Sequence, residues 1–269
     1  MGYFIGTDDA VKIFVEDVGP SDGQVLFLIH GWPVDHRMFE YQMNQLPKMG
    51  FRIILMDIRG FGKSDRPYTG YSYDRLSDDI RAVIETLQLK NIALGGFSMG
   101  GAIAIRYMAR HSGYSIRKLA LFGAAAPSFT KRPDYPHGMA KSEVTKLIQQ
   151  TYTDRPDMLT GFGQIFFAKY ISESFKNWFQ SLGLDASGHG TAQTAESLRD
   201  EDLRGDLGKI TVPTAIFHGM KDQICPFVFA ELMHKGILDS ELIPFKYSGH
   251  GLFYDELEKF NRELIRFLE

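Results

Sequence analysis

The sequence predicts an α/β fold, in which helices cover both faces of a mostly parallel central sheet and a helical cap is inserted. Two observations support this fold class. Several short runs are apolar at every position, which is typical of strands buried on both faces. Most of these runs alternate with amphipathic helical patterns, and this alternation indicates right-handed βαβ units. The apolar runs are residues 25–29, 53–56, 92–94, 119–122 and 214–217.

The two ends of the chain also carry strand patterns. Residues 11–15 place apolar side chains at alternate positions, which predicts an antiparallel strand at the start of the sheet. Residues 241–245 predict the last strand, and a helix is expected after it over residues 254–268.

One long segment breaks the alternation of strands and helices. Residues 128–207 have a helical pattern with Pro and Gly interruptions and many aromatic side chains. This segment lies too deep in the series of strands to be a tail. We therefore predict a core domain made of residues 1–127 and 208–269, with residues 128–207 forming a helical cap insertion.

Composition and charge exclude several classes of protein. The 269 residues carry 30 basic and 33 acidic side chains, a net charge of −3, which is too balanced for binding nucleic acid through bulk electrostatics. No apolar run approaches the roughly 18 residues that a membrane span needs. The single cysteine allows no intrachain disulfide and fits a reducing compartment. We expect a cytoplasmic protein without nucleic-acid or membrane partners; whether it forms a homo-oligomer stays open.

Two stretches, residues 19–23 and 96–100, match the G-x-S-x-G pattern of a nucleophile elbow. An elbow needs a buried strand before the serine and a helix directly after it. Ser98 follows the apolar run 92–94 and precedes a helix that begins with small residues, whereas Ser21 is followed directly by a strand. Ser98 is therefore the candidate nucleophile, and Ser21 is interpreted as part of a hairpin turn. The alternative for Ser98 is a helix N-cap in a chance match.

A serine nucleophile needs a base, and the base needs an orienting acid. In elbow-containing folds these groups follow one another along the chain as serine, acid and histidine. Asp222 is the only carboxylate in the loop after the strand at 214–217, and His250 lies between two glycines after the last strand. Their joint placement predicts a Ser98–Asp222–His250 triad.

The tetrahedral intermediate of acyl transfer needs two N–H donors for its oxyanion. One donor is the backbone N–H of Met99, directly after the serine. The other is expected from the loop after the first parallel strand, where Pro33 has no N–H and Trp32 must supply it.

With these residues the chain resembles α/β-hydrolases of the cofactor-free haloperoxidase and aryl esterase family, the perhydrolase-type serine esterases. The resemblance is carried by His30-Gly31-Trp32-Pro33, residues 57–65, residues 96–101, residues 198–203, Val212-Pro213-Thr214, Asp222-Gln223-Ile224 and Gly249-His250-Gly251. It implies the α/β-hydrolase fold and an acyl pocket walled by Trp32, with Ile224 and Phe227 at the entrance. Residues 128–184 do not align with the family, so the resemblance leaves substrate choice open.

Aromatic residues of the cap give two hypotheses. Phe162, Phe166 and Tyr170 recur at every fourth position, which predicts that they share a helix face. Either they only pack the cap onto the core, or Phe162 and Phe166 also wall the acyl pocket and limit chain length.

Other chemistries of this fold are excluded by residue type. Dehalogenases and epoxide hydrolases use an aspartate nucleophile, and dienelactone-type hydrolases use a cysteine, but Cys225 lies on the loop of the acid. No spacing of histidines and carboxylates predicts a metal site, and we expect no cofactor. Asp57, Arg59 and Asp65 are interpreted as an ion-pair and turn network that holds their loop.

These observations predict a serine carboxylesterase that cleaves small acyl or aryl esters through an acyl-enzyme, with a small-molecule ester as its partner. The family resemblance adds a perhydrolase or haloperoxidase side activity, in which hydrogen peroxide replaces water. The alternative is a hydrolase-fold signalling receptor with slow or vestigial turnover.

Overall fold

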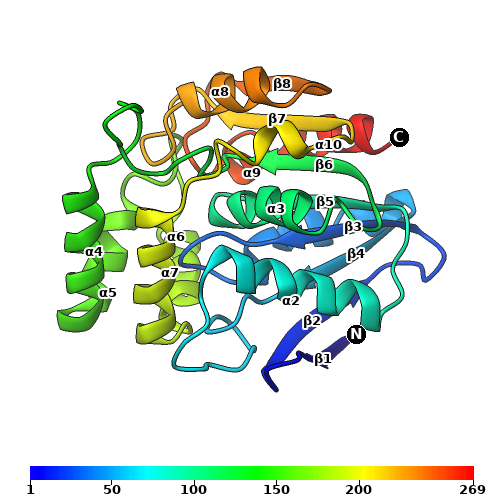
Figure 1. The fold of residues 1–269 in the computed structure, drawn as a ribbon, viewed down its shortest axis with the longest axis horizontal. Helices are drawn as coiled ribbons and strands as arrows, with labels where there is room; N and C mark the ends of the chain where they lie inside the picture. The colour runs from blue at the N-terminus through cyan, green and yellow to red at the C-terminus, as the bar shows by residue number, and fades with distance from the viewer.

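A computed structural model describes all residues from 1 to 269 and contains one eight-stranded sheet (Figure 1). The strands are β1 (Gly2–Gly6), β2 (Lys12–Val18), β3 (Gln24–Ile29), β4 (Phe51–Met56), β5 (Ile92–Phe97), β6 (Ile116–Phe122), β7 (Thr214–Gly219) and β8 (Ser240–Phe245). Their order across the sheet is β1-β2-β4-β3-β5-β6-β7-β8. Only β1 and β2 pair in antiparallel fashion with their neighbours; the other six strands run parallel. The predicted mostly parallel sheet is therefore confirmed, and β1 is an additional edge strand.

Helices cover both faces of this sheet. Figure 1 shows α2 (Tyr73–Thr86) and α3 (Met99–Arg110) in front of the strands, with α9 (Leu252–Asp255) and α10 (Leu257–Leu268) behind them. The remaining elements outside the insertion are η1 (His36–Phe39), α1 (Glu40–Met43), η2 (Leu46–Met49), η3 (Leu207–Lys209) and α8 (Val228–Gly236). The helix predicted over residues 254–268 is divided in two in the structure, because α9 ends at Asp255 and α10 begins at Leu257.

Local sequence explains where α2 begins and which side it buries. The side chain of Ser72 accepts a hydrogen bond from the Arg75 N–H, which satisfies one of the unpaired donors at the helix start. Leu76, Ile80 and Val83 recur on one side of this helix, and all three are buried.

The segment between β6 and β7 is a helical insertion. It holds α4 (Lys141–Thr153), α5 (Arg155–Gly163), α6 (Glu173–Leu184) and α7 (Gly188–Asp200). The helices pack in pairs, α4 on α7 and α5 on α6. Figure 1 shows them together at one end of the strands, the left side of that view. No helix of the structure combines the length and the apolar character needed to cross a membrane.

The prediction that Phe162, Phe166 and Tyr170 share a helix face is wrong. Helix α5 ends at Gly163, and Tyr170 lies in the following loop with 91% of its surface exposed. Gly161 and Gly163 weaken the last turn of the helix. After a last turn of hydrogen bonds to carbonyls three residues back, the N–H groups of Ala168 and Lys169 bind the Asp255 carboxylate instead of helix carbonyls.

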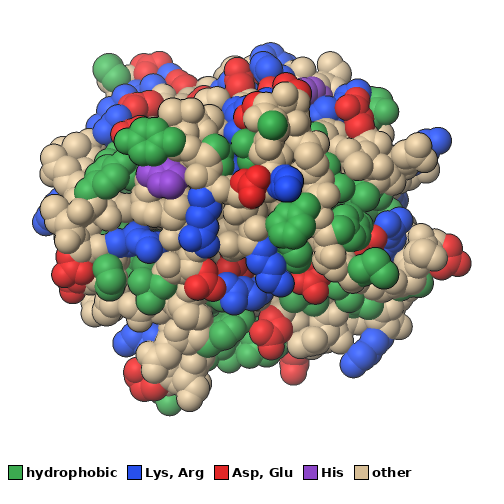
Figure 2. Space-filling model, turned by 90° about the horizontal axis from the view of Figure 1, so that it is seen from below, with side chains coloured by type: hydrophobic (Ala, Val, Ile, Leu, Met, Phe, Trp, Pro, Cys, Tyr) green, Lys and Arg blue, Asp and Glu red, His purple; other side chains and the backbone are tan.

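Charges on the surface are mixed in sign. Figure 2 views the molecule from below Figure 1, and on that face Lys and Arg side chains alternate with Asp and Glu side chains without forming a large patch of one sign. Such a face does not create the basic footprint of a nucleic-acid-binding surface.

Candidate active site

Ser98 occupies a sharp turn between β5 and α3. Its backbone has φ 53° and ψ −117°, a conformation that non-glycine residues rarely adopt and that is common at functional sites. The turn requires small neighbours: a Cβ on Gly96 would lie 2.4 Å from the Gly100 carbonyl oxygen, and a Cβ on Gly100 would lie 2.4 Å from the Ile29 carbonyl oxygen. Ser21, the other serine in this sequence pattern, is exposed in the turn between β2 and β3.

Asp222 and His250 form a buried pair at the ends of β7 and β8. The Nδ1–H of His250 donates to Asp222 Oδ2 over 2.7 Å, and both side chains are fully buried. The other oxygen of Asp222 accepts the backbone N–H groups of Ile224 and Cys225, each at 2.8 Å. His250 Nε2 has no hydrogen-bond partner in the protein. This arrangement fixes the tautomer in which Nε2 carries the lone pair that a general base needs.

Three neighbours surround the imidazole, and this role was predicted from the sequence for none of them. The ring of His250 lies 4.7 Å from the Phe97 ring and 5.0 Å from the Phe166 ring, between centroids. Gly123 follows β6 with a positive φ of 50°, and a Cβ there would approach His250 Nδ1 to 3.5 Å and Asp222 Oδ2 to 3.6 Å. Aromatic residues and glycines are too common in the sequence for this role to be visible there.

The predicted oxyanion donors are free to bind a ligand. A Cβ on Gly31 would lie 2.9 Å from the Ser98 Cβ, so the glycine lets this loop approach the serine closely. The next residue, Trp32, makes no hydrogen bond through its backbone N–H. Met99 is the first residue of α3, so its N–H has no partner within the helix.

A narrow apolar pocket of about 330 Å³ of empty volume adjoins Ser98. Trp32 and Phe162 form part of its wall with an edge-to-face contact at 5.0 Å, and the Trp32 indole N–H is fixed by the Thr191 carbonyl at 2.9 Å. Ile224 also lines the pocket, with side chains of α4 and α7. Of the residues predicted for the substrate pocket, the structure therefore brings Trp32, Phe162 and Ile224 together with Ser98.

Phe166 and Phe227 lie elsewhere. Phe166 is 1% exposed and packs on the His250 ring because the chain turns after α5. It lines a second hollow of about 480 Å³, which also contains Pro33 and Phe179. Phe227 directly precedes α8, with its ring 5.9 Å from the His218 ring, and does not line the pocket next to Ser98. Phe162 borders both hollows and separates them.

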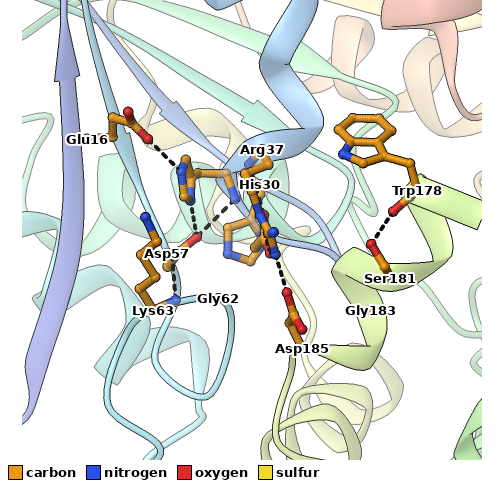
Figure 3. Close-up of polar contacts among 12 residues, drawn as sticks. Glu16, His30, Arg37, Asp57, Gly62, Lys63, Trp178, Ser181, Gly183 and Asp185 are labelled. Atoms are coloured by element: carbon orange, nitrogen blue, oxygen red, sulfur yellow. Dashed lines mark hydrogen bonds and ion pairs between the residues drawn. The ribbon is translucent and has the colours of Figure 1, made fainter. Parts of the chain in front are cut away.

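The loop after β4 is held by ion pairs of Asp57 and Arg59, as interpreted from the sequence, whereas Asp65 makes no ion pair and its carboxylate accepts the Lys12 N–H at 2.8 Å. His36 lies between the carboxylates of Asp57 and Glu16, both labelled in Figure 3: its Nδ1 contacts Asp57 at 2.7 Å and its Nε2 contacts Glu16 at 2.8 Å. Burial alone would lower the pKa of His36, but the two carboxylates raise it overall. Arg59, fully buried, pairs with Asp79 at 2.7 Å.

The ligand atoms of Asp35, His36 and Asp57 lie within 4.8 Å of one another, close enough to suggest a metal site. However, both ring nitrogens of His36 are bound to carboxylates, and Asp35 binds the Arg37 guanidinium. These contacts use the same atoms that a metal would need, so the cluster is an ion-pair network.

His30, His218 and Cys225 have structural roles. His30 Nδ1–H donates to the Gly31 carbonyl while its Nε2 accepts the Ile58 N–H, both at 2.9 Å. His218 Nε2–H donates to the Cys225 carbonyl at 2.7 Å, and burial lowers the pKa of both histidines. Burial raises the pKa of the Cys225 thiol well above its ordinary value, which opposes thiolate formation.

Comparisons with known proteins identify the family of the chain. Residues 24–257 match the family described as alpha/beta hydrolase fold. The chain is 54% identical over 267 residues to the AB hydrolase superfamily protein YisY of Bacillus subtilis (strain 168), covering 99% of each chain. It is 33% identical over 282 residues to the bifunctional esterase/perhydrolase DCH of Acinetobacter calcoaceticus, covering 100% of this chain and 99% of the relative.

Two solved structures share the whole fold. One is an esterase from Exiguobacterium antarcticum, with a TM-score of 0.97, 54% identity and coverage of 100% of this chain and 99% of that one. The other is a bromoperoxidase from Bacillus anthracis, with a TM-score of 0.95, 35% identity and the same coverage. The chain therefore belongs to the α/β-hydrolase family, among relatives that are named esterase, perhydrolase and bromoperoxidase.

Proposed function

We propose that this protein is a serine carboxylesterase that cleaves small acyl or aryl esters through an acyl-enzyme. The observation that carries the proposal is the buried His250–Asp222 pair, whose 2.7 Å contact leaves His250 Nε2 unpaired, together with the strained turn that presents Ser98. A serine, a tautomerically fixed imidazole and a buried carboxylate are the groups that acyl transfer requires.

Each group has one role in the proposed reaction. Ser98 Oγ attacks the ester carbonyl carbon while its proton passes to His250 Nε2. The oxyanion accepts hydrogen bonds from the N–H groups of Trp32 and Met99. The bond to the alcohol then breaks, and the imidazolium returns the proton to the leaving oxygen. Water repeats the sequence on the acyl-enzyme and releases the acid, while Asp222 stabilises the imidazolium in both halves.

The shape of the site supports short acyl groups. The pocket next to Ser98 is narrow and apolar, and Phe162 closes it toward the second hollow. We treat residues 128–207 as the cap that supplies Phe162 and so sets the limit on chain length. A relative named esterase at 54% identity supports the same class of reaction.

A second activity, perhydrolysis, is favoured by a specific feature of the oxyanion loop. The Trp32 carbonyl accepts no hydrogen bond from the protein, and Pro33 after it has no N–H. A free acceptor there can bind the far oxygen of hydrogen peroxide as it attacks the acyl-enzyme and forms a peracid. Relatives named perhydrolase and bromoperoxidase support this proposal.

A panel of p-nitrophenyl esters from acetate to octanoate tests the proposed function on the purified protein. Steady turnover that is fastest with the short esters is the expected result. A single slow turnover with no return of free protein would contradict the carboxylesterase and would instead fit a signalling receptor of this fold. A panel in which every chain length reacts equally would contradict the pocket assignment alone.

A further inference from the structure

A buried carboxylate outside the triad joins two distant segments next to His250. Asp255 is the last residue of α9 and is 5% exposed. Its Oδ2 accepts the Gly249 N–H at 2.8 Å and the Ala168 N–H at 2.9 Å, and its Oδ1 accepts the Lys169 N–H at 3.1 Å. One of these N–H donors belongs to the loop of the histidine and two belong to the helical insertion, so the carboxylate bridges the two segments.

The same two segments also touch directly. The Gly251 N–H donates to the Phe166 carbonyl at 2.8 Å. A Cβ on Gly251 would lie 2.2 Å from the Phe167 ring, and a Cβ on Gly249 would lie 3.0 Å from the Ala168 nitrogen. The glycines on both sides of His250 are therefore required by the insertion that packs against this loop.

The contact between the insertion and the histidine loop also involves the packing around the His250 imidazole. The residue that precedes Phe167 is Phe166, whose ring stands edge-on to the His250 ring at 5.0 Å. The Phe97 ring lies 4.7 Å from the same imidazole. The insertion thus supplies one of the two aromatic rings that pack on the His250 imidazole and fix its orientation.

The carboxylate occupies this place at a cost to folding. Burial raises the pKa of Asp255, although the three N–H donors and the charge of Lys169 act in the opposite direction. A raised carboxyl pKa means that the ionised group is less favourable in the folded chain than in the unfolded chain. A group kept against such a cost is typical of functional sites.

We infer that Asp255 is a positioning residue, which fixes the helical insertion on the histidine loop and so holds Phe166 against His250. The inference rests on the proposed function of His250 as general base. It predicts that the placement of the insertion and the catalytic competence of His250 are coupled, although Asp255 itself touches no substrate.

Glu256 offers a matched control in the next position. Its carboxylate accepts the Tyr247 N–H at 2.9 Å and the Ser248 hydroxyl at 2.7 Å, so it supports the histidine loop without contacting the insertion. Comparing Asp255→Asn with Glu256→Gln therefore separates the bridge to the insertion from general support of the loop.

Hydrogen exchange tests the bridge without reference to activity. In Asp255→Asn an amide group replaces one acceptor oxygen, so the amides of Ala168, Lys169 and Gly249 should all exchange faster. Glu256→Gln should leave the amides of Ala168 and Lys169 protected. Unchanged protection of these two amides in Asp255→Asn would overturn the inference. If Asp255→Asn does not fold, hydrogen exchange of the wild-type protein tests the bridge instead. The amides of Ala168, Lys169 and Gly249 should then share one protection factor, and unrelated values would contradict a common bridge.

Kinetics test the coupling to His250. With p-nitrophenyl acetate, Asp255→Asn should lower kcat about 10- to 100-fold, a range typical of a slightly misplaced catalytic group, while KM stays nearly constant. Phe166→Ala should lower kcat as well, and the double variant should be no slower than Asp255→Asn alone, because both changes act through the same ring. Fully additive losses would overturn the route through Phe166. If the wild type turns over the ester and Asp255→Asn has the same kcat, only the positioning role of Asp255 is refuted. If the wild type shows no turnover, the proposed function is refuted. In that case the hydrogen-exchange experiment still tests the bridge between the insertion and the histidine loop.

Discussion

The Asp222 carboxylate is satisfied on both oxygens before any substrate binds: Oδ2 receives the His250 Nδ1–H at 2.7 Å, and Oδ1 receives the Ile224 and Cys225 N–H groups at 2.8 Å. The acid is thus fixed by its own loop, and it in turn fixes the imidazole.

We expect Asp222→Asn to keep the fold but to lower kcat about 10⁴-fold, because an amide does not stabilise the imidazolium and favours the wrong tautomer. Steady-state kinetics with a p-nitrophenyl ester, alongside a circular dichroism melt, measures both quantities. A folded Asp222→Asn protein with nearly full kcat would contradict the role of Asp222.

Acyl-chain preference should depend on Phe162. This side chain separates the pocket next to Ser98 from the second hollow, so Phe162→Ala should connect the two and shift the preferred p-nitrophenyl ester toward longer chains. The matched control is Phe175→Ala, since Phe175 is a buried aromatic residue of the same insertion that stacks on Tyr254 and lines neither hollow. Loss of thermal stability in both variants without a change in chain-length preference would mean that Phe162 only packs the insertion.

The ion-pair network under the oxyanion loop should stabilise the fold in a pH-dependent way. Because the Asp57 and Glu16 carboxylates raise the pKa of His36 above its ordinary value of 6.5, its contribution is fully present below that pH and is lost as pH rises through the folded-state pKa. His36→Gln should therefore cost on the order of 1–3 kcal/mol of unfolding free energy at pH 6 and less at pH 9.

Urea unfolding at the two pH values measures this difference. His111→Gln is the control: burial lowers the pKa of His111, so any effect of that substitution should have the opposite dependence on pH. An equal loss in His36→Gln at pH 6 and pH 9 would show that the charge of His36 does not stabilise the network.

Peroxide selectivity should depend on Pro33. If the free Trp32 carbonyl accepts a hydrogen bond from hydroperoxide, Pro33→Leu should relax the loop and lower the ratio of peracid formation to hydrolysis. Both rates are measured in one preparation with a short ester and hydrogen peroxide. A ratio that does not change on substitution would assign Pro33 a structural role only.

The sheet and the placement of the candidate triad could be predicted because each relevant loop follows a strand that the sequence pattern marks, a fully apolar run before Ser98 and Asp222 and the last strand before His250. The runs that end before Ser98, Asp222 and His250 became β5, β7 and β8, which place their loops at one edge of the sheet. The local sequence pattern is sufficient to predict β5 and β7, because a strand buried on both faces is apolar at nearly every position.

The insertion was harder to predict because a distant residue decides its local structure. Four-residue spacing suggested one helix through Phe166 and Tyr170, but α5 ends at Gly163, and the N–H groups of Ala168 and Lys169 bind the carboxylate of Asp255, 87 residues beyond Ala168. The periodicity of a sequence predicts only contacts between residues a few helical turns apart, and not contacts with residues that are distant along the chain. For the same reason the packing of Phe166 on His250, rather than in the pocket next to Ser98, could not be inferred.

The central claim is that Ser98 is the nucleophile, and covalent trapping tests it most directly. Wild-type protein and the Ser21→Ala control are treated with a p-nitrophenyl alkylphosphonate, and the site of the adduct is found by peptide mass spectrometry. We expect one adduct per chain on Ser98 in both proteins, none in Ser98→Ala, and a loss of ester turnover in Ser98→Ala of about 10⁴-fold or more. An adduct on another residue, or a Ser98→Ala protein that keeps more than about one hundredth of the wild-type kcat, would contradict the account.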